Sequence, residues 1–228
     1  MNESLFDPLR LRKNEWYSVE RGEEPIQCKS CKYAKVLWIG TSVEPPWEEW
    51  GRIVQWMGYP GEGKWRIFWF PADVPRQLPQ RGNPITSQHI NGGYCYPCSA
   101  HTIVIYRIQE ATRVLLHELL HAACTDPPGA SLPIKEATTE TWAEIFLVAL
   151  CSQGDLKKAK ALWKMQSQWI VNQNKRVKEE NSVLSSEDYA WRYTVGRELI
   201  LRSLHIRLPK GRMDSSRSLR LTHPSLCI

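Results

Sequence analysis

His117 and His121 lie four residues apart, with Glu118 beside the first of them, in the segment His117-Glu-Leu-Leu-His121. In an α-helix, side chains four residues apart lie above one another on the same face. The two imidazoles can then ligate one metal ion, while the carboxylate of Glu118 takes a proton from a metal-bound water. This spacing therefore predicts a zinc site that activates water.

The surrounding residues predict the helix that this chemistry needs. The run from residue 110 to residue 123 contains neither proline nor glycine, and Leu115, Leu116 and Leu119 give it apolar surface. We therefore expect a helix that is buried on most sides and turns one polar strip toward a cleft. The alternative interpretation is a pair of structural histidines beside a surface glutamate, with no metal.

A zinc ion that activates water takes three protein ligands and keeps one position open, so a further side chain is needed. A second helical run covers residues 134–150, after the turn-forming segment 126–129 and Pro133. Three glutamates share one face of that run because they are spaced by four residues, namely Glu136, Glu140 and Glu144. Carboxylates in an apolar helix need a partner, and a metal ion is one.

The spacing of these residues resembles that of a known family. Eighteen residues separate His121 from Glu140, and Thr139-Glu-Thr-Trp-Ala143 is similar to the third-ligand segment of the alanyl-aminopeptidase family of gluzincin metallopeptidases. Tyr193-Thr-Val-Gly196 resembles that family's Tyr-x-x-Gly element. The resemblance covers residues 117–196.

This resemblance implies a zinc metallopeptidase of the gluzincin type. Its zinc ligands are His117, His121 and Glu140, its general base is Glu118, and Tyr193 stabilises the tetrahedral intermediate. Glu136 is the alternative third ligand, and Glu144 is placed to orient a ligand histidine. The family's glutamate for the free amino end of a substrate has no counterpart in Gly92–Pro97, so cleavage inside or at the end of a peptide stays open.

The cysteines form two Cys-x-x-Cys pairs, at Cys28 and Cys31 and at Cys95 and Cys98. Four thiolates can close a second, structural zinc site, whereas disulfides are the alternative in an oxidising compartment. The remaining thiols lack a matching partner, and we interpret Cys124 and Cys151 as small core residues. The expected cofactor is thus one catalytic zinc ion, with a structural one if the pairs bind metal.

The 228 residues, of which 42% are hydrophobic, suit one main domain with its own core. The sequence contains no run of eighteen apolar residues, so no transmembrane helix is expected. The N-terminal residues also lack the pattern of a signal peptide. We therefore expect no membrane association and an intracellular protein, although a mature form with its signal removed also fits.

The order of the predicted elements gives an α+β, zincin-like fold. We expect an arm at 1–25, a catalytic domain at 26–205 and a basic tail at 206–228. Within that domain, 26–106 form a mostly antiparallel sheet and 107–205 form helices. Strands are expected at 34–39 and 101–106, and a hairpin is expected where 51–58 and 64–70 flank a Pro/Gly-rich turn. Helices are expected at 155–170 and from residue 186 onward.

Basic charge is concentrated at the C-terminus. Residues 202–228 hold six basic side chains and one acidic one, which is a net +5 of the chain's +6. Such a segment is usually a solvated tail, and it can contact nucleic acid or another acidic partner. The alternative to a peptidase acting on peptides or proteins is therefore a non-catalytic, zinc-stabilised protein that binds nucleic acid or a protein partner. A third possibility combines hydrolysis with nucleic-acid binding: a protease that cleaves DNA-bound proteins and uses the basic tail as its tether.

Overall fold

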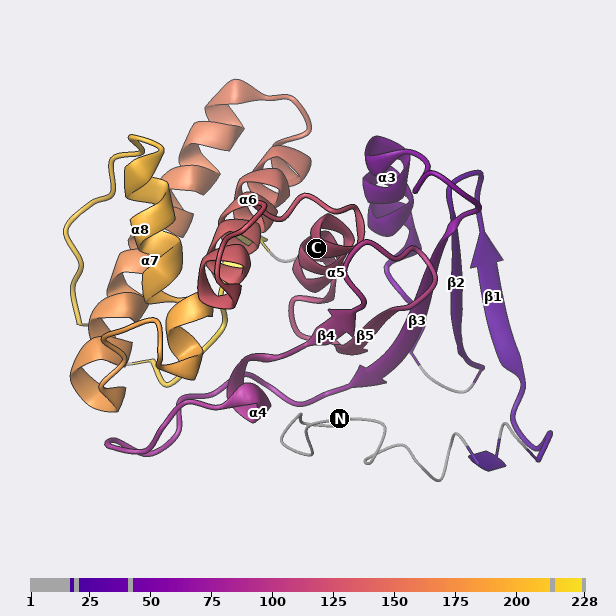
Figure 1. Ribbon diagram of the computed structural model, residues 1–228, viewed down its shortest axis with the longest axis horizontal. Helices are drawn as coiled ribbons and strands as arrows, with labels where there is room; N and C mark the ends of the chain where they lie inside the picture. Colours follow the sequence, from indigo (N-terminus) through magenta and orange to yellow (C-terminus); the bar gives the residue numbers. More distant parts are fainter. Residues whose placement is uncertain (1–16, 19–20, 41–42, 214–215, 227–228) are drawn as a thin grey trace. The chain divides into compact units, whose positions relative to one another are not determined.

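The structure, a computed structural model, describes residues 17–18, 21–40, 43–213 and 216–226. The chain forms two compact units. The sheet unit lies within residues 1–74 and 91–125, and the helical unit comprises residues 75–90 and 126–227. Figure 1 shows strands in the first and helices in the second, which confirms the predicted α+β class.

The sheet unit contains a five-stranded sheet in the order β1-β2-β3-β5-β4 (Figure 1). Its strands are β1 (Ile26–Ser30), β2 (Ala34–Ile39), β3 (Trp65–Ala72), β4 (Gly93–Cys95) and β5 (Ile103–Arg107). The outer pairs, β1 with β2 and β4 with β5, are antiparallel, whereas β3 runs parallel to both β2 and β5. The sheet is therefore mixed, and the prediction of a mostly antiparallel sheet is wrong.

The predicted hairpin is wrong because helix α3 (Trp47–Met57) lies where its first strand was expected. The buried side chains of α3 are Trp50, Ile53 and Val54, at the spacing of one helical face. Gly58 follows the helix with a φ of 72°, a value that glycine adopts without strain. The chain thus crosses over through α3, and this connection allows β2 and β3 to run parallel.

Helix α5 (Ala111–Ala122) is the predicted motif helix, and it follows the predicted strand β5. All of its residues are buried, and it packs against β4 and β5. Because α5 packs on the sheet, it belongs to the sheet unit. The unit boundary therefore falls after Thr125 rather than after residue 106.

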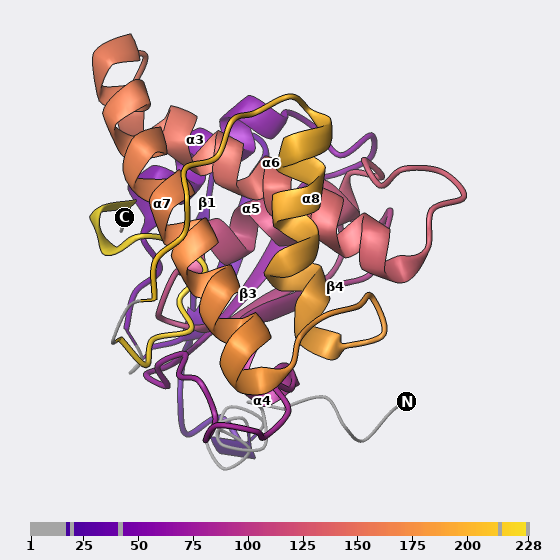
Figure 2. The same ribbon diagram turned by 90° about the vertical axis from the view of Figure 1, so that its left-hand side faces the viewer.

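The helical unit is built from α6, α7 and α8, which follow one another in sequence (Figure 2). Its elements are α4 (Ser87–Ile90), α6 (Leu132–Ser152), α7 (Leu156–Asn181), η1 (Tyr189–Tyr193), α8 (Val195–Ser203) and η2 (Pro224–Leu226). The helices predicted near 134–150 and 155–170 are thus confirmed, and α7 is longer than expected. The helix predicted from residue 186 is divided into η1 and α8.

The sequence predicts that the C-terminal segment is a solvated tail. The structure instead packs this segment on the helical unit. Leu219, Leu221 and Leu226 are buried, and the first two belong to the core of the helical unit together with Val177 and Trp191. Two α7 side chains bind its backbone, since Trp169 Nε1 and Gln173 Nε2 both donate to the Arg220 carbonyl, at 2.8 and 2.6 Å. Its buried leucines, rather than its net charge, decide where this segment packs.

Most of the predicted arm at 1–25 lies outside the described residues, as does Cys227. In the part of the chain that is described, no helix combines the length and the apolar character needed to span a membrane.

Candidate active site

The three residues of the HExxH motif lie together on α5 and are removed from solvent. His117, Glu118 and His121 are 6%, 7% and 7% exposed. An ionisable side chain that is this deeply buried needs a partner, because burial otherwise disfavours its charged form. The motif is thus held in a restricted geometry by the packing of α5.

The two imidazoles converge. Their Nε2 atoms are 3.1 Å apart, and the ring centroids are 4.6 Å apart with the planes at 78°. Two nitrogens bound to one tetrahedral zinc at about 2.0–2.1 Å each lie about 3.3 Å from one another. The geometry of the pair therefore fits shared ligation of zinc. A direct hydrogen bond between two neutral imidazoles has a similar distance, so metal analysis must distinguish the two.

The end of β4 and the loop after it hold the end of the motif helix. The Cys95 thiol donates to the Glu118 carbonyl at 3.3 Å, and the Cys98 amide donates to the His121 carbonyl at 3.1 Å. A disulfide then joins Cys98 to Cys124, two residues after α5 ends. These contacts fix the turn of α5 that carries Glu118 and His121.

The same disulfide corrects the prediction of a four-cysteine zinc site. Cys98 is bonded to Cys124, so it is not available as a thiolate ligand, and Cys124 is not a core residue. Cys28 is exposed on β1, while Cys31 and Cys95 are partly buried. Within the described residues, none of these thiols belongs to a cluster of three or more side chains that could hold a metal. Cys151, which was also predicted to be a core residue, is only half-buried.

The glutamates of α6 belong to the helical unit and have different surroundings. Glu140 and Glu144 are buried, at 2% and 1% exposure, and Glu136 is half-buried. The prediction that the glutamates of this face are buried carboxylates is therefore confirmed for Glu140 and Glu144.

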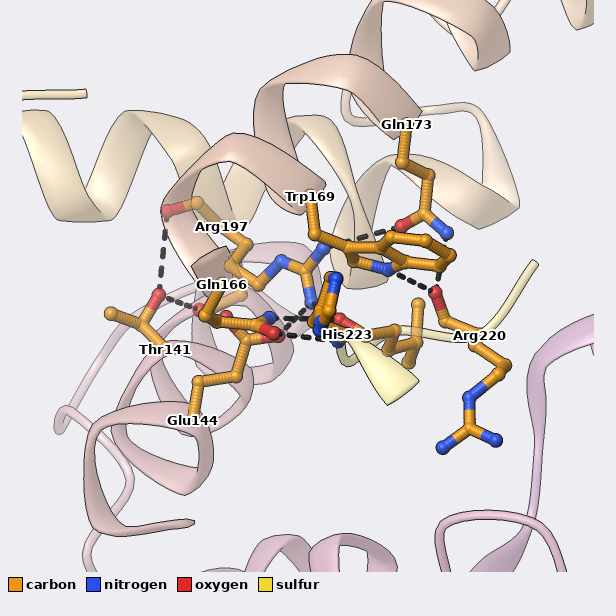
Figure 3. Close-up of polar contacts among 10 residues, drawn as sticks. Thr141, Glu144, Gln166, Trp169, Gln173, Arg197, Arg220 and His223 are labelled. Atoms are coloured by element: carbon orange, nitrogen blue, oxygen red, sulfur yellow. Dashed lines mark hydrogen bonds and ion pairs between the residues drawn. The ribbon is translucent and has the colours of Figure 1, made fainter. Parts of the chain in front are cut away.

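Glu144 forms a buried ion pair with Arg197 of α8 (Figure 3), and neither side chain is exposed. The guanidinium also donates from Nη1 to the Leu221 carbonyl at 3.0 Å and from Nη2 to Gln173 Oε1 at 3.3 Å. The structure thus gives Glu144 a role in joining α6 to α8, where the sequence predicted that it orients a ligand histidine. Arg197 itself was missed, because nothing in its sequence surroundings marks a buried cation.

Tyr193 also lies in the helical unit, at the end of η1, with its ring 5.5 Å from that of Tyr189. Loss of solvation raises the pKa of Tyr193 well above its ordinary value of 10.0, and the negative charge of Glu136 raises it further. The hydroxyl therefore keeps its proton at neutral pH and remains a hydrogen-bond donor. A donor of this kind is what an oxyanion requires.

The predicted residues thus divide between the units: His117, Glu118 and His121 in the sheet unit, and Glu136, Glu140 and Tyr193 in the helical unit. Comparison of the chain with models of protein families, with curated proteins and with solved structures gives no match. The likeness to gluzincins is therefore one of motif and spacing.

Proposed function

We propose that this protein is a zinc-dependent peptidase of the gluzincin type. The observation that carries the proposal is the 3.1 Å separation of two Nε2 atoms on a buried helix that also carries Glu118. His117 and His121 would hold the ion, and Glu140 of α6 is the proposed third ligand. When bound, zinc supplies the Lewis acidity that makes water a nucleophile at neutral pH.

Glu118 has the central role among the protein's own groups. Its carboxylate takes one proton from the water as the water oxygen attacks the peptide carbonyl carbon. The same carboxyl group then gives this proton to the amide nitrogen, so the C–N bond breaks and an amine leaves. The disulfide and the Cys95 and Cys98 hydrogen bonds hold the helical turn that carries Glu118, which limits the freedom of the base.

Tyr193 is the proposed donor to the carbonyl oxygen as negative charge develops on it. The raised pKa supports this role because it keeps the hydroxyl protonated, and so able to donate, at neutral pH. Glu136 competes with Glu140 for the third-ligand role. We assign it to Glu140 because its spacing from His121 resembles that of the family, and Glu136 is the alternative ligand.

A cleavage assay with Glu118→Gln tests the proposal. The amide is isosteric but cannot accept the proton, so cleavage of casein or of a mixed peptide library should fall by about 10² or more, while zinc content stays that of wild type. Glu179→Gln, at an exposed glutamate of α7, is the matched control and should cleave normally. Full activity of Glu118→Gln would refute the mechanism, as would activity that survives complete removal of the metal.

A further inference from the structure

A hollow of about 970 Å³ runs along α7 on the helical unit, apart from the residues of the proposed peptidase. It is lined by one face of α7, by residues 207–209 and by His223. Its volume is at the upper end of the roughly 300–1,000 Å³ that is usual for ligand sites. The hollow therefore has room for an extended ligand.

The charge around this hollow is of one sign. Lys160, Lys164 and Arg207 line it, and its lining includes no aspartate or glutamate among the residues that the structure describes. The flanking sequence continues this pattern, because residues 156–173 hold four lysines and no acid, and residues 206–213 hold Arg207, Lys210 and Arg212 and no acid. Such a surface selects an anionic ligand.

Two tryptophans also line the hollow. Trp169 is held in place, since its Nε1 donates to the Arg220 carbonyl at 2.8 Å and its ring meets that of His223 edge to face at 5.7 Å (Figure 3). Trp163 is half-buried, so part of its indole faces the solvent. Indole rings stack on unpaired bases, and cations along the same groove bind the phosphates.

One wall of the hollow is fixed to α7. Gln168 Nε2 donates to the Lys210 carbonyl at 3.2 Å, and the Arg212 amide donates to Asn172 Oδ1 at 2.7 Å. Between them, a Cβ at Gly211 would lie 2.8 Å from the Val171 carbonyl oxygen, so only glycine allows this close approach. The basic segment is thus placed before any ligand arrives, which reduces the entropy lost on binding.

We propose that this hollow binds single-stranded nucleic acid. Lys160, Lys164 and Arg207 contact phosphates, and bases stack on Trp163. An acidic peptide satisfies the cations but not the indoles, and paired bases in a duplex do not expose the faces that stack. The proposal goes beyond peptide hydrolysis and does not depend on it, because the hollow uses none of the residues assigned to that reaction.

The test measures binding of a fluorescent oligothymidylate of about 12 nucleotides to the full-length protein. Trp163→Ala should raise the Kd about tenfold, whereas Trp163→Phe, which keeps an aromatic face, should bind nearly as wild type does. Lys160→Ser and Lys164→Ser should each raise the Kd and lower the slope of log K against log salt by roughly 0.7. Lys175→Ser, at an exposed lysine of α7 that does not line the hollow, should change neither.

Competitors separate the possible ligands. Unlabelled single strand should displace the probe, whereas duplex of equal length, thymidine monophosphate and oligoglutamate should not do so at equal concentration. Displacement by any of these three would overturn the assignment to a single strand, as would wild-type binding by Trp163→Ala or an equal loss in Lys175→Ser. If Trp163→Ala does not fold, as judged by circular dichroism, the two lysine variants and Lys175→Ser decide the question.

Discussion

At the scale of single residues, the convergence of His117 and His121 is a consequence of helical geometry. A spacing of four residues on α5 brings the two Nε2 atoms to 3.1 Å, and burial keeps both rings in place. The sequence was sufficient to predict this arrangement because the periodicity of one helix determines it. The identity of the third ligand depends on a separate helix and could be proposed only from spacing.

Replacement of Tyr193 tests its role as an oxyanion donor. Tyr193→Phe should lower kcat roughly a hundredfold with little change in KM or zinc content, because the donor acts mainly in the transition state. Tyr59→Phe, at an exposed tyrosine of the sheet unit, is the control. An unchanged kcat in Tyr193→Phe would leave the residue with a packing role alone.

The raised pKa of Tyr193 gives this residue a second, non-kinetic signature. A group whose pKa is higher in the folded state stabilises the fold below its unfolded pKa. For Tyr193, that contribution is present below about pH 10 and is lost as the pH rises toward the folded-state pKa. Above pH 10, denaturant titration should therefore show a steeper loss of stability in wild type than in Tyr193→Phe, and parallel curves would contradict the assignment.

The buried pair of Glu144 and Arg197 makes a different prediction, on stability. Glu144→Gln removes one charge and leaves a buried guanidinium, which should cost about 3–5 kcal/mol of unfolding free energy. Arg202→Ala, which breaks a pair with Glu198 at a 52% exposed arginine, should cost less than about 1 kcal/mol. If Glu144→Gln unfolds at the wild-type urea concentration, the pair does not stabilise the helical unit.

The partner of Glu144 could not be predicted from sequence. Arg197 lies 53 residues further along the chain, and their meeting depends on how α8 packs against α6. Because the sequence does not reveal Arg197 as a partner, the spacing of the three glutamates led to the prediction that a metal ion balances this acidic face. Local periodicity shows which face of a helix is unusual, but tertiary packing decides what each side chain on it contacts.

At the scale of elements, the motif helix and the long helices after it were predicted, whereas α3 was missed although its buried side chains lie on one helical face. Residues 51–58 contain Ile53, Val54 and Trp56, residue types that favour strands. Their interpretation as a strand was wrong because the helix begins four residues earlier, at Trp47, with Glu48 and Glu49 in its first turn. Residues 51–58 by themselves do not contain these helix-start signals.

The disulfide after α5 is a further case in which sequence spacing misled. Cys-x-x-Cys pairing is local, whereas the bond that forms joins Cys98 to Cys124, 26 residues apart. On the chain-entropy model, closing a loop of this length stabilises a fold by about 3–4 kcal/mol. Cys124→Ser should therefore lower the unfolding free energy by up to that amount.

Cys151→Ser is the control for this variant, because Cys151 lies on α6 and takes no part in the disulfide between Cys98 and Cys124. Because the bond lies beside the motif turn, Cys124→Ser should also weaken zinc retention against a chelator, which Cys151→Ser should not. Alkylation of the native protein followed by mass spectrometry should find Cys98 and Cys124 protected. Free Cys124 in that experiment would contradict the pairing.

At the scale of the whole molecule, net charge was a poor guide to where the C-terminal segment packs. The basic C-terminal residues were expected to form a tail, but leucines at 219, 221 and 226 bury the segment on the helical unit. Arg207 of the basic C-terminal region lines the hollow together with Lys160 and Lys164 of α7, whereas Arg217 pairs with Glu180. The sequence predicts contact with an acidic partner or nucleic acid, and the proposed binding of a single strand to the hollow on α7 stays a prediction.

Metal binding should also be visible in the stability of the whole chain. A ligand that binds only the folded state stabilises it by about 2.7 kcal/mol at a concentration one hundred times its Kd. Chelation of zinc should thus lower the Tm by roughly 5–10 °C, and added zinc should restore it. The His117→Ala variant should show no response to either treatment.

The zinc content of the purified protein tests the central claim most directly. The account predicts one zinc ion per wild-type chain, one in Glu118→Gln, and none in His117→Ala or His121→Ala. It also predicts loss of zinc in Glu140→Gln but not in Glu136→Gln. Wild-type protein without zinc after purification and reconstitution, or zinc that persists in His117→Ala, would mean that the two histidines only bond to each other.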